Sequence, residues 1–435
     1  MVTARRISRR AVAIALVCGA VVGISGCSAS DEAGEGGSTI VMGMNSGLIP
    51  QFQAYVDVYN SIDPDNQVEL QPVPDATGDY LQQLITQNIS GDLPDIIFNG
   101  DTLNAQFTEN DLLFDLAPWL NEGKDGLTND FIPAFVDQYI ADPSTGAITG
   151  LPVSADSTML FYNKTLFQKA GVTELPTDDW TWEDVYRVAK QISSAGDGQY
   201  WGLRTPILTG DAIFVDYPFL SAGGSEFYDA DAKRYDFANE AGLETWEFML
   251  QPYTEGWGSP FPVAGDATDY FAAGKVAMTL DTRPAIARFR DGLTDDWDVV
   301  NLPTYNGKPT VGGGSYALAI SQGSDNKDAA WKFLAWFYSN EGGMKEAEPN
   351  GVIPATEDGI DNGGWRNDTN SVPANLIPAT EYAVTNAQLS PVFPISTASD
   401  LGPALLEAVQ QVVLNGESVD TAFTTAQDKL NALID

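Results

Sequence analysis

The sequence predicts an α/β protein with room for two domains, and three observations carry this prediction. The chain has 435 residues, of which 43% are hydrophobic and 19% charged, enough for two domains with sizeable cores. Strand-like and helix-like segments alternate from residue 39 onward, as in parallel sheets wrapped by helices. The stretch 150–164 predicts an extended segment that passes from one half of the protein to the other and continues as a strand.

The first part of the chain predicts three strands and two helices. In the first helix, apolar side chains recur at helical spacing at Phe52, Tyr55, Val56 and Tyr59. The strands are expected at 39–44, 68–73 and 95–98, and the second helix at 80–89. This order favours a parallel sheet for these strands.

Polar residues follow two of these strands. Asn45 and Ser46 come after the first strand, and Asn99 and Asp101 come after the third. Ligands bind at the carboxyl ends of the strands in such sheets, so these four side chains are candidates for a binding cleft. The same residue types also cap helices and form turns, and that alternative stays open.

Asp156 is a lone carboxylate among small residues in the crossing stretch. A carboxylate on a segment that joins two halves of a protein would lie in the cleft between them, whereas the alternative is an aspartate in a surface loop. Directly after the stretch, Asn163 is expected to cap a short helix over 165–170, and Gly171 suits the left-handed position past its end.

The middle of the chain predicts further helices and aromatic segments. Thr181 is the expected cap of a helix, an amphipathic helix covers 243–250, and Tyr217 lies in an aromatic segment over 213–220. Trp257 lies in a loop over 255–260, where its indole either fills a core or presents a face to a ligand.

A hairpin is expected at 227–236, and its aspartates superficially resemble a calcium loop. Arg234 stands where such a loop has its sharp glycine turn, so we expect no metal there.

The last part of the chain predicts more strands and the closing helices. A strand over 276–280 delivers Asp281 and Arg283 at its end. The run 312–316, which contains Gly313 and Ser315, lacks the Gly-Lys-Ser/Thr of a phosphate loop and therefore indicates backbone that approaches a neighbour or ligand closely. The other strands are expected at 297–302 and 317–320, and the helices at 329–338, 404–414 and 419–434.

Charge and composition exclude several classes of function. The 22 Lys and Arg residues against 60 Asp and Glu residues give a net charge of −38, which repels nucleic acid and anionic lipid and disfavours anionic ligands. The chain has no histidine, which removes serine–histidine triads, cysteine–histidine pairs and histidine-based zinc sites.

The N-terminal residues have the pattern of an export signal. Four arginines precede an apolar run over 11–23 that is shorter than the roughly 20 residues of a membrane-spanning helix. The sequence Ile-Ser-Gly-Cys at 24–27 resembles the lipobox of bacterial lipoproteins, which predicts a signal peptide over 1–26, lipidation of Cys27 and a flexible tether over 27–38. Ordinary secretory cleavage near Cys27 is the alternative, and both the Sec and the twin-arginine export routes stay open.

Several segments together resemble one family, the extracellular solute-binding proteins of carbohydrate ABC transporters, to which maltose-binding protein belongs. The resemblance covers Ser38 to Asp435, and the segments that carry it are 151–156, 161–164, 271–278, 302–303 and 351–354. It implies a two-lobe periplasmic-binding-protein-like fold with a ligand cleft between lobes that crossing strands join. By position, the N-terminal lobe would comprise 39–153 and 314–351, the C-terminal lobe 154–313 and 352–435, and the crossing strands would lie near 154–157 and 309–313.

The resemblance also implies roles for individual residues. Asp156 would accept hydrogen bonds from sugar hydroxyls, Tyr217 follows a segment that supplies stacking aromatics, and Asp281 and Arg283 would face the ligand. Many relatives have an aromatic residue in place of Arg283. Sugar recognition combines aromatic faces with planar polar groups, as these residue types provide.

The expected function is therefore a binding protein, lipid-anchored on the extracellular face of a bacterial membrane. It would capture a neutral oligosaccharide and deliver it to the permease subunits of an ABC transporter, acting as a monomer without catalytic residues, metal or cofactor and without binding nucleic acid. The alternative is an extracellular glycoside-cleaving enzyme that uses a carboxylate pair. A purely structural surface lipoprotein is a third hypothesis, which the aromatic loops around the inferred cleft disfavour.

Overall fold

The computed structural model describes residues 37–73, 77–142, 145–204, 213–261, 268–345, 353, 355–367, 373–390 and 397–434. Residues from Gly37 onward form one compact unit. The predicted signal peptide, Cys27 and most of the tether lie outside the described residues, as do Gly351, Val352 and Pro354. Among the helices that are described, none has the length and apolar character needed to cross a bilayer.

The first lobe is built on a five-stranded sheet. Its strands, in spatial order, are β2 (Asn66–Val73), β1 (Ser38–Asn45), β3 (Ile96–Gly100), β16 (Tyr316–Ile320) and β6 (Leu151–Pro152). β1 runs parallel to both β2 and β3, which confirms the parallel arrangement expected for the first three strands. β16 returns antiparallel between β3 and β6.

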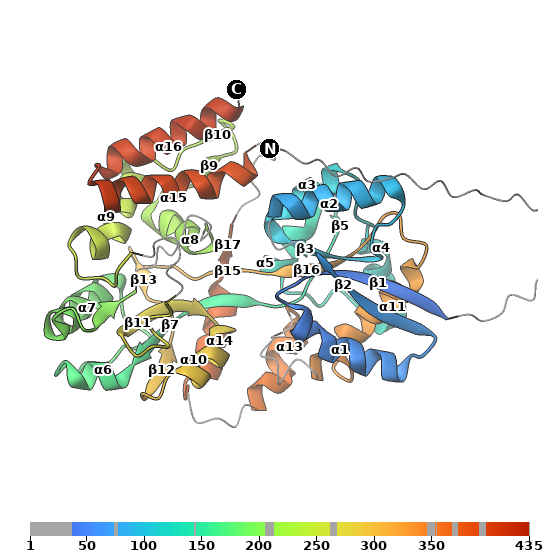
Figure 1. Cartoon of the computed structure of the whole chain (residues 1–435), viewed down its shortest axis with the longest axis horizontal. Helices are drawn as coiled ribbons and strands as arrows, with labels where there is room; N and C mark the ends of the chain where they lie inside the picture. Colours follow the sequence, from blue (N-terminus) through green and yellow to red (C-terminus); the bar gives the residue numbers. More distant parts are fainter. Residues whose placement is uncertain are drawn as a thin grey trace, which may run out of the picture. The chain divides into compact units, whose positions relative to one another are not determined.

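Helices α1 (Ile49–Ile62), α2 (Thr77–Ser90) and α11 (Lys327–Phe337) belong to this lobe (Figure 1). The apolar stripe predicted for α1 is buried against the sheet and α11. Phe52 stacks on Phe337 with ring centroids 6.0 Å apart, and Tyr59 meets Phe333 edge to face at 5.1 Å. These contacts hold α1 against α11.

The second lobe is built on a mixed sheet. Its strands, in spatial order, are β17 (Gln388–Leu389), β15 (Gly312–Gly314), β7 (Asp156–Asn163), β11 (Val276–Thr282) and β8 (Trp201–Leu203), and β12 (Trp297–Val300) also pairs with β7. β7 is antiparallel to β15, β11 and β12. Phe161 on β7 packs with Phe271, Phe289 and Trp297 in the core of this lobe.

Two predicted helix caps are present. The side chain of Asn163 accepts a 3.0 Å hydrogen bond from the Leu166 amide at the start of α6 (Lys164–Lys169). Thr181 and Asp184 form a reciprocal capping box at the start of α7 (Trp182–Gly196).

The remaining elements complete the two lobes. The helices are η1 (Asp101–Leu103), α3 (Asn104–Glu109), α4 (Ala117–Glu122), η2 (Lys124–Gly126), α5 (Pro133–Val136), η3 (Asp137–Tyr139), α8 (Ile213–Gly223), α9 (Glu240–Thr254), α10 (Ala285–Gly292), α13 (Glu357–Asn362), η4 (Gly364–Asn367), α14 (Leu376–Asn386), α15 (Ala398–Asn415) and α16 (Val419–Ile434). Three small strand pairs are β4 (Ile140–Asp142) with β5 (Ala147–Ile148), β9 (Tyr228–Asp229) with β10 (Arg234–Tyr235), and β13 (Thr304–Tyr305) with β14 (Lys308–Pro309).

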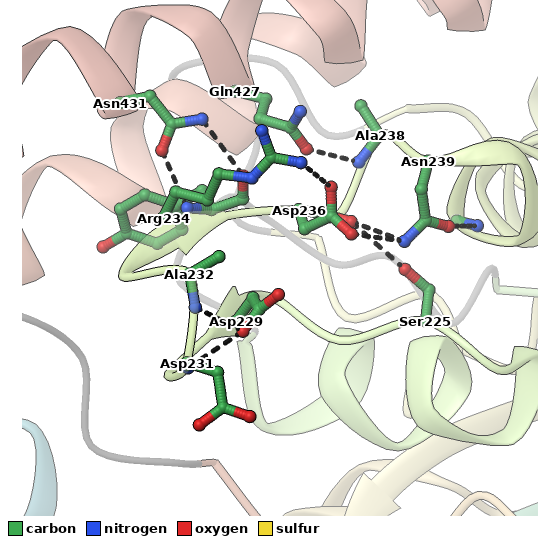
Figure 2. Close-up of polar contacts among 12 residues, drawn as sticks. Ser225, Asp229, Asp231, Ala232, Arg234, Asp236, Ala238, Asn239, Gln427 and Asn431 are labelled. Atoms are coloured by element: carbon green, nitrogen blue, oxygen red, sulfur yellow. Dashed lines mark hydrogen bonds and ion pairs between the residues drawn. The ribbon is translucent and has the colours of Figure 1, made fainter.

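The predicted hairpin at 227–236 is confirmed as the antiparallel pair β9–β10. Figure 2 shows that one oxygen of Asp229 accepts hydrogen bonds from the backbone amides of Asp231 and Ala232, both 2.9 Å long, and so holds the turn. The amide side chain of Asn431 on α16 bonds both the N–H and the carbonyl of Tyr235, at 2.7 and 3.0 Å. The closing helix therefore covers the backbone of β10.

The chain passes between the two sheets at two short segments. Val153 to Ala155 link β6 to β7, as the crossing stretch predicted, and Ser315 alone separates β15 from β16. The second passage lies beyond the predicted position near 309–313, because Gly313 and Gly314 still pair with Ser157 and Asp156 in the second sheet.

A third connection follows α11. Ala355 and Glu357 hydrogen-bond to first-lobe backbone, since the Ile132 amide donates to the Ala355 carbonyl and the Glu357 amide donates to the Asp130 carbonyl, both at 2.9 Å. Next to them, the Ala155 amide of the first crossing donates to the Ile353 carbonyl at 2.9 Å. The described residues that follow the predicted lobe boundary at 351/352, namely Ile353, Ala355 and Glu357, therefore bond to the first lobe or to the first crossing.

Candidate functional site

A cavity of about 420 Å³ opens where the strand ends of the two sheets meet. The first lobe lines it through the ends of β1, β2 and β3 and through α2 and η1, and the second lobe through β7, β11, β15 and α8. The described lining residues are Asn45, Val73, Tyr80, Phe98, Gly100, Asp101, Leu103, Asp156, Ile213, Phe214, Thr282, Gly313, Gly314, Ser315, Tyr316 and Ser390. Five of the residues predicted from sequence are in this set: Asn45, Asp101, Asp156, Gly313 and Ser315.

An aromatic platform forms one part of the lining. The ring of Tyr316 stacks on Phe98 with centroids 4.7 Å apart and an interplanar angle of 27°. Tyr316 nevertheless keeps 50% of its surface exposed, which is unusual for a large aromatic residue. Behind it, the Tyr80 hydroxyl donates a 2.9 Å hydrogen bond to the Phe98 carbonyl. The platform is thus anchored on one face and open on the other.

Asp156 lies at the first residue of β7, beside the crossing. The Ser154 hydroxyl donates a 2.7 Å hydrogen bond to its Oδ2 atom. Burial raises the pKa of the Asp156 carboxyl above its usual value, while the Ser154 hydrogen bond and the charge of Arg283 oppose the rise. Asp156 is therefore a partly desolvated acceptor with capacity left for further donors.

Glycines bring the two lobes close together at this point. A Cβ atom on Gly314 would lie 3.1 Å from the Asp101 Oδ2 atom, so the Asp101 carboxylate packs directly against β15. A Cβ atom on Gly312 would lie 1.6 Å from the Phe214 carbonyl oxygen, a distance that no side chain tolerates. The prediction that this glycine run allows a close backbone approach is confirmed.

The crossing at Ser315 is held by hydrogen bonds. The buried Tyr139 hydroxyl donates to the Ser315 carbonyl at 2.5 Å, and the Ser315 hydroxyl donates to the Tyr316 carbonyl at 2.8 Å. The Ser154 amide, from the other crossing, donates to the Ser315 hydroxyl at 3.3 Å. The two crossings are thereby joined immediately beside Asp156.

Four predicted residues at strand ends do not line the cavity. Ser46 is exposed, and its hydroxyl donates to the Val73 carbonyl at 3.1 Å. Asn99 is fully buried and donates a 2.8 Å hydrogen bond to the Asn104 side chain. Successive strand residues point to opposite faces, so Phe98 and Gly100 reach the cavity while Asn99 points away.

The same alternation of side chains between the two faces of a strand applies at the end of β11, where Thr282 points to a different face from Asp281. Thr282 lines the cavity, whereas Asp281 pairs with Arg288, which also bonds Asp269 through Nε at 2.7 Å. The Arg283 guanidinium lies 5.6 Å from the ring centroid of Trp365, and the residue is only 7% exposed. The two residues predicted from sequence, Asp281 and Arg283, therefore flank Thr282, the residue that lines the cavity.

The two predicted second-lobe aromatics also lie outside the lining. Trp257 packs in the second-lobe core, 5.0 Å from the ring of Tyr186, and its indole Nε1 donates to Glu255 at 2.9 Å. Tyr217 lies on α8, one turn beyond the lining residues Ile213 and Phe214. Its ring is partly buried against Phe227.

The aromatic lining residues Tyr80, Phe98, Phe214 and Tyr316 were not predicted from sequence. For Tyr316 a signal was present, because an aromatic residue opens a strand directly after a run of three glycines and a serine. Its exposure depends on the packing of Phe98 beneath it, which the sequence alone does not specify.

Comparison with known proteins identifies the family. The model of the bacterial extracellular solute-binding proteins matches residues 45–344. This chain belongs to that family. The lining described above is therefore the candidate solute site of a binding protein with two lobes.

Individual relatives share only about a quarter of their residues with this chain. The arabinooligosaccharide-binding protein of Bacillus subtilis is 26% identical over 74% of this chain and 74% of its own length, and the maltotriose-binding protein of Pyrococcus abyssi is 25% identical over 83% and 75%. Among solved structures, an ABC substrate-binding protein of Listeria monocytogenes in complex with cycloalternan superposes with a TM-score of 0.79 at 24% identity, covering 92% of this chain and 99% of that one. That likeness establishes the two-lobe fold.

Proposed function

We propose that this solute-binding protein captures an oligosaccharide in the cavity between its lobes and delivers it to an ABC transporter permease. The observation that carries the proposal is the open face of Tyr316 next to two carboxylates, Asp101 and Asp156. An aromatic ring packs on the apolar C–H face of a pyranose, while carboxylates accept hydrogen bonds from its hydroxyls. Three of the relatives described above bind oligosaccharides according to their names, which supports the same ligand class here.

A thermal-shift screen of mono- and oligosaccharides tests the proposal. A ligand that binds only the folded state raises the melting temperature, by an amount that grows with its concentration relative to Kd. We expect an oligosaccharide to raise it and a sugar phosphate to leave it unchanged, because the lining carries carboxylates and the protein is strongly acidic. A shift with sugar phosphates alone would contradict the proposal.

Binding should close the lobes. The crossings at 153–155 and at Ser315 are short and adjacent, so rotation about them would bring Asp101 and Asp156 onto a bound sugar from both sides. Small-angle scattering should report a smaller radius of gyration at saturating sugar. An unchanged radius would indicate a rigid site.

The lipid anchor and the site of action belong to the same proposal. Cys27 is the cysteine of the lipobox-like sequence at 24–27, so the chain would be exported, acylated and held as a monomer on the extracellular face of the membrane. Cys27→Ala should release it from membranes into the medium. Full retention of that variant would remove the anchor from the proposal and leave the sugar site untouched.

The glycoside-cleaving hypothesis makes a distinct prediction. Two carboxylates line the cavity, as such an enzyme requires, but the family consists of binding proteins. Prolonged incubation should therefore return the bound sugar intact by mass spectrometry. Release of shorter sugars that Asp156→Ala abolishes would favour the enzyme instead.

A further inference from the structure

The described cavity lining combines two carboxylates and four aromatic rings with no cationic side chain. The carboxylates are Asp101 and Asp156, and the rings are Tyr80, Phe98, Phe214 and Tyr316. Every Lys and Arg after Arg10 belongs to the described residues, so the segments at 74–76, 205–212, 262–267 and 391–396 contain none. Those segments therefore add no Lys or Arg side chain to this lining.

The two carboxylates come from different lobes and line the same cavity as the Tyr316 ring. Asp101 begins η1 at the end of β3, and Asp156 begins β7. Burial raises the pKa of the Tyr316 hydroxyl above its usual value, and the charges of Asp101 and Asp156 raise it further. The Tyr316 side chain thus lies in the negative field of two carboxylates, one from each lobe.

A buried cation, Arg283, lies close to the cavity without being among its described lining residues. Arg283 follows Thr282, the cavity-facing residue of β11, and is held over the ring of Trp365 with 7% of its surface exposed. Its charge opposes the rise in the pKa of Asp156 that burial causes. An anionic solute would find no cationic side chain among the described lining residues. A neutral sugar would donate hydrogen bonds to the carboxylates only through its hydroxyls.

From this arrangement we infer that the solute carries a positively charged nitrogen, as in an amino sugar or its oligomers. The inference rests on the proposed function and deepens it. A protonated amine would lie against the Tyr316 face and donate to the Asp101 and Asp156 carboxylates, combining a cation–π contact with charge-assisted hydrogen bonds. The remaining hydroxyls and the C–H face of the sugar would contact the other aromatic residues.

A matched pair of probes isolates the charge. Glucosamine oligosaccharides and N-acetylglucosamine oligosaccharides of equal length and linkage differ only in the charge and acylation of the amine. At about pH 6, below the usual pKa of an amine, the first set is cationic and the second neutral. Calorimetry on the purified protein should give at least about tenfold tighter binding for the cationic set, as one charge-assisted hydrogen bond provides.

Variants connect that preference to the lining. Asp101→Asn keeps the size of the side chain and removes one charge, so the cationic-to-neutral affinity ratio should fall about tenfold. Asp428→Asn is the matched control, since Asp428 is exposed on the closing helix α16 and its loss changes the net charge equally. The ratio should be unchanged in the control, and added salt should reduce it in the wild type.

The outcomes separate the inference from the proposed function. Equal or tighter binding of the N-acetylated sugars overturns the inference and leaves the sugar proposal standing. Binding of choline without any amino sugar supports the charged nitrogen but contradicts the sugar. Failure of both the glucosamine oligosaccharides and choline to bind overturns the inference, as does a ratio that falls equally in Asp101→Asn and Asp428→Asn.

Discussion

The strands near the crossings have two faces that differ in their surroundings: one faces the cavity and the other packs within the fold. On the cavity side, Asp156, Thr282 and Tyr316 present acceptors and an aromatic ring to the space between the lobes. On the opposite side, Asn99, Asp281 and Arg283 engage Asn104, Arg288 and Trp365 and hold the fold together. A shift of one residue along a strand separates a side chain that lines the cavity from one that packs within the fold, because side chains alternate between faces. The predictions below test this division in order of their expected effect on affinity.

The largest loss of affinity is expected for Asp156→Ala. An ionised carboxylate that accepts hydrogen bonds from a ligand contributes about 1.5–3 kcal/mol, so binding should weaken by roughly ten- to a hundred-fold. Titration calorimetry with the best sugar from the screen measures it. A native melting curve is the control, and wild-type affinity in the folded variant would remove Asp156 from the site.

A smaller loss is expected for Tyr316→Ala. Stacking contributes about 0.5–1.5 kcal/mol beyond the area buried, so affinity should fall by about tenfold. The apolar contact also gives binding a negative heat-capacity change, which should become smaller in the variant. Calorimetry at several temperatures measures both quantities, and an unchanged heat capacity of binding would show that the ring does not face the ligand.

A few-fold loss of affinity with a gain of stability is expected for Asp156→Asn. The amide keeps an acceptor but loses the charge, which weakens hydrogen bonds to roughly half their strength. Burial raises the folded pKa above the ordinary value of 3.8, so the folded state holds the proton more tightly than the unfolded state does. The ionised carboxyl therefore costs stability, a cost that is absent below the unfolded pKa and grows as the pH rises through the folded pKa.

Melting curves of both proteins as a function of pH check the sign. Without ligand, Asp156→Asn should be more stable than wild type at neutral pH, and the difference should shrink as the pH falls through that window. Equal pH dependence in the two proteins would mean that the folded environment does not perturb Asp156.

The sequence predicted the fold more fully than the site, for a physical reason. Helical periodicity and capping residues are local, so α1, the Asn163 cap and the Thr181 capping box followed directly from the pattern. The crossing stretch also marked Asp156, because a carboxylate among small residues is unusual there. The choice between Asp281 and Thr282 depends on which face of β11 meets the cavity, and that is a property of the packed sheets. For a similar reason the second crossing lies later in the chain than predicted, because Gly314 still pairs with Asp156 in the second sheet.

Aromatic residues were the hardest to assign, and Trp257→Ala tests that point. Trp257 is packed in the second-lobe core against Tyr186, so truncation should cost about 3–5 kcal/mol of unfolding free energy and leave affinity unchanged. Tyr316→Ala should show the reverse, since half of that residue is already exposed and its removal leaves no buried void. Denaturant titrations and calorimetry on both variants measure the two quantities side by side. A folded Trp257→Ala protein with tenfold weaker binding would place its indole at the ligand, and the division between cavity and core aromatics would then fail.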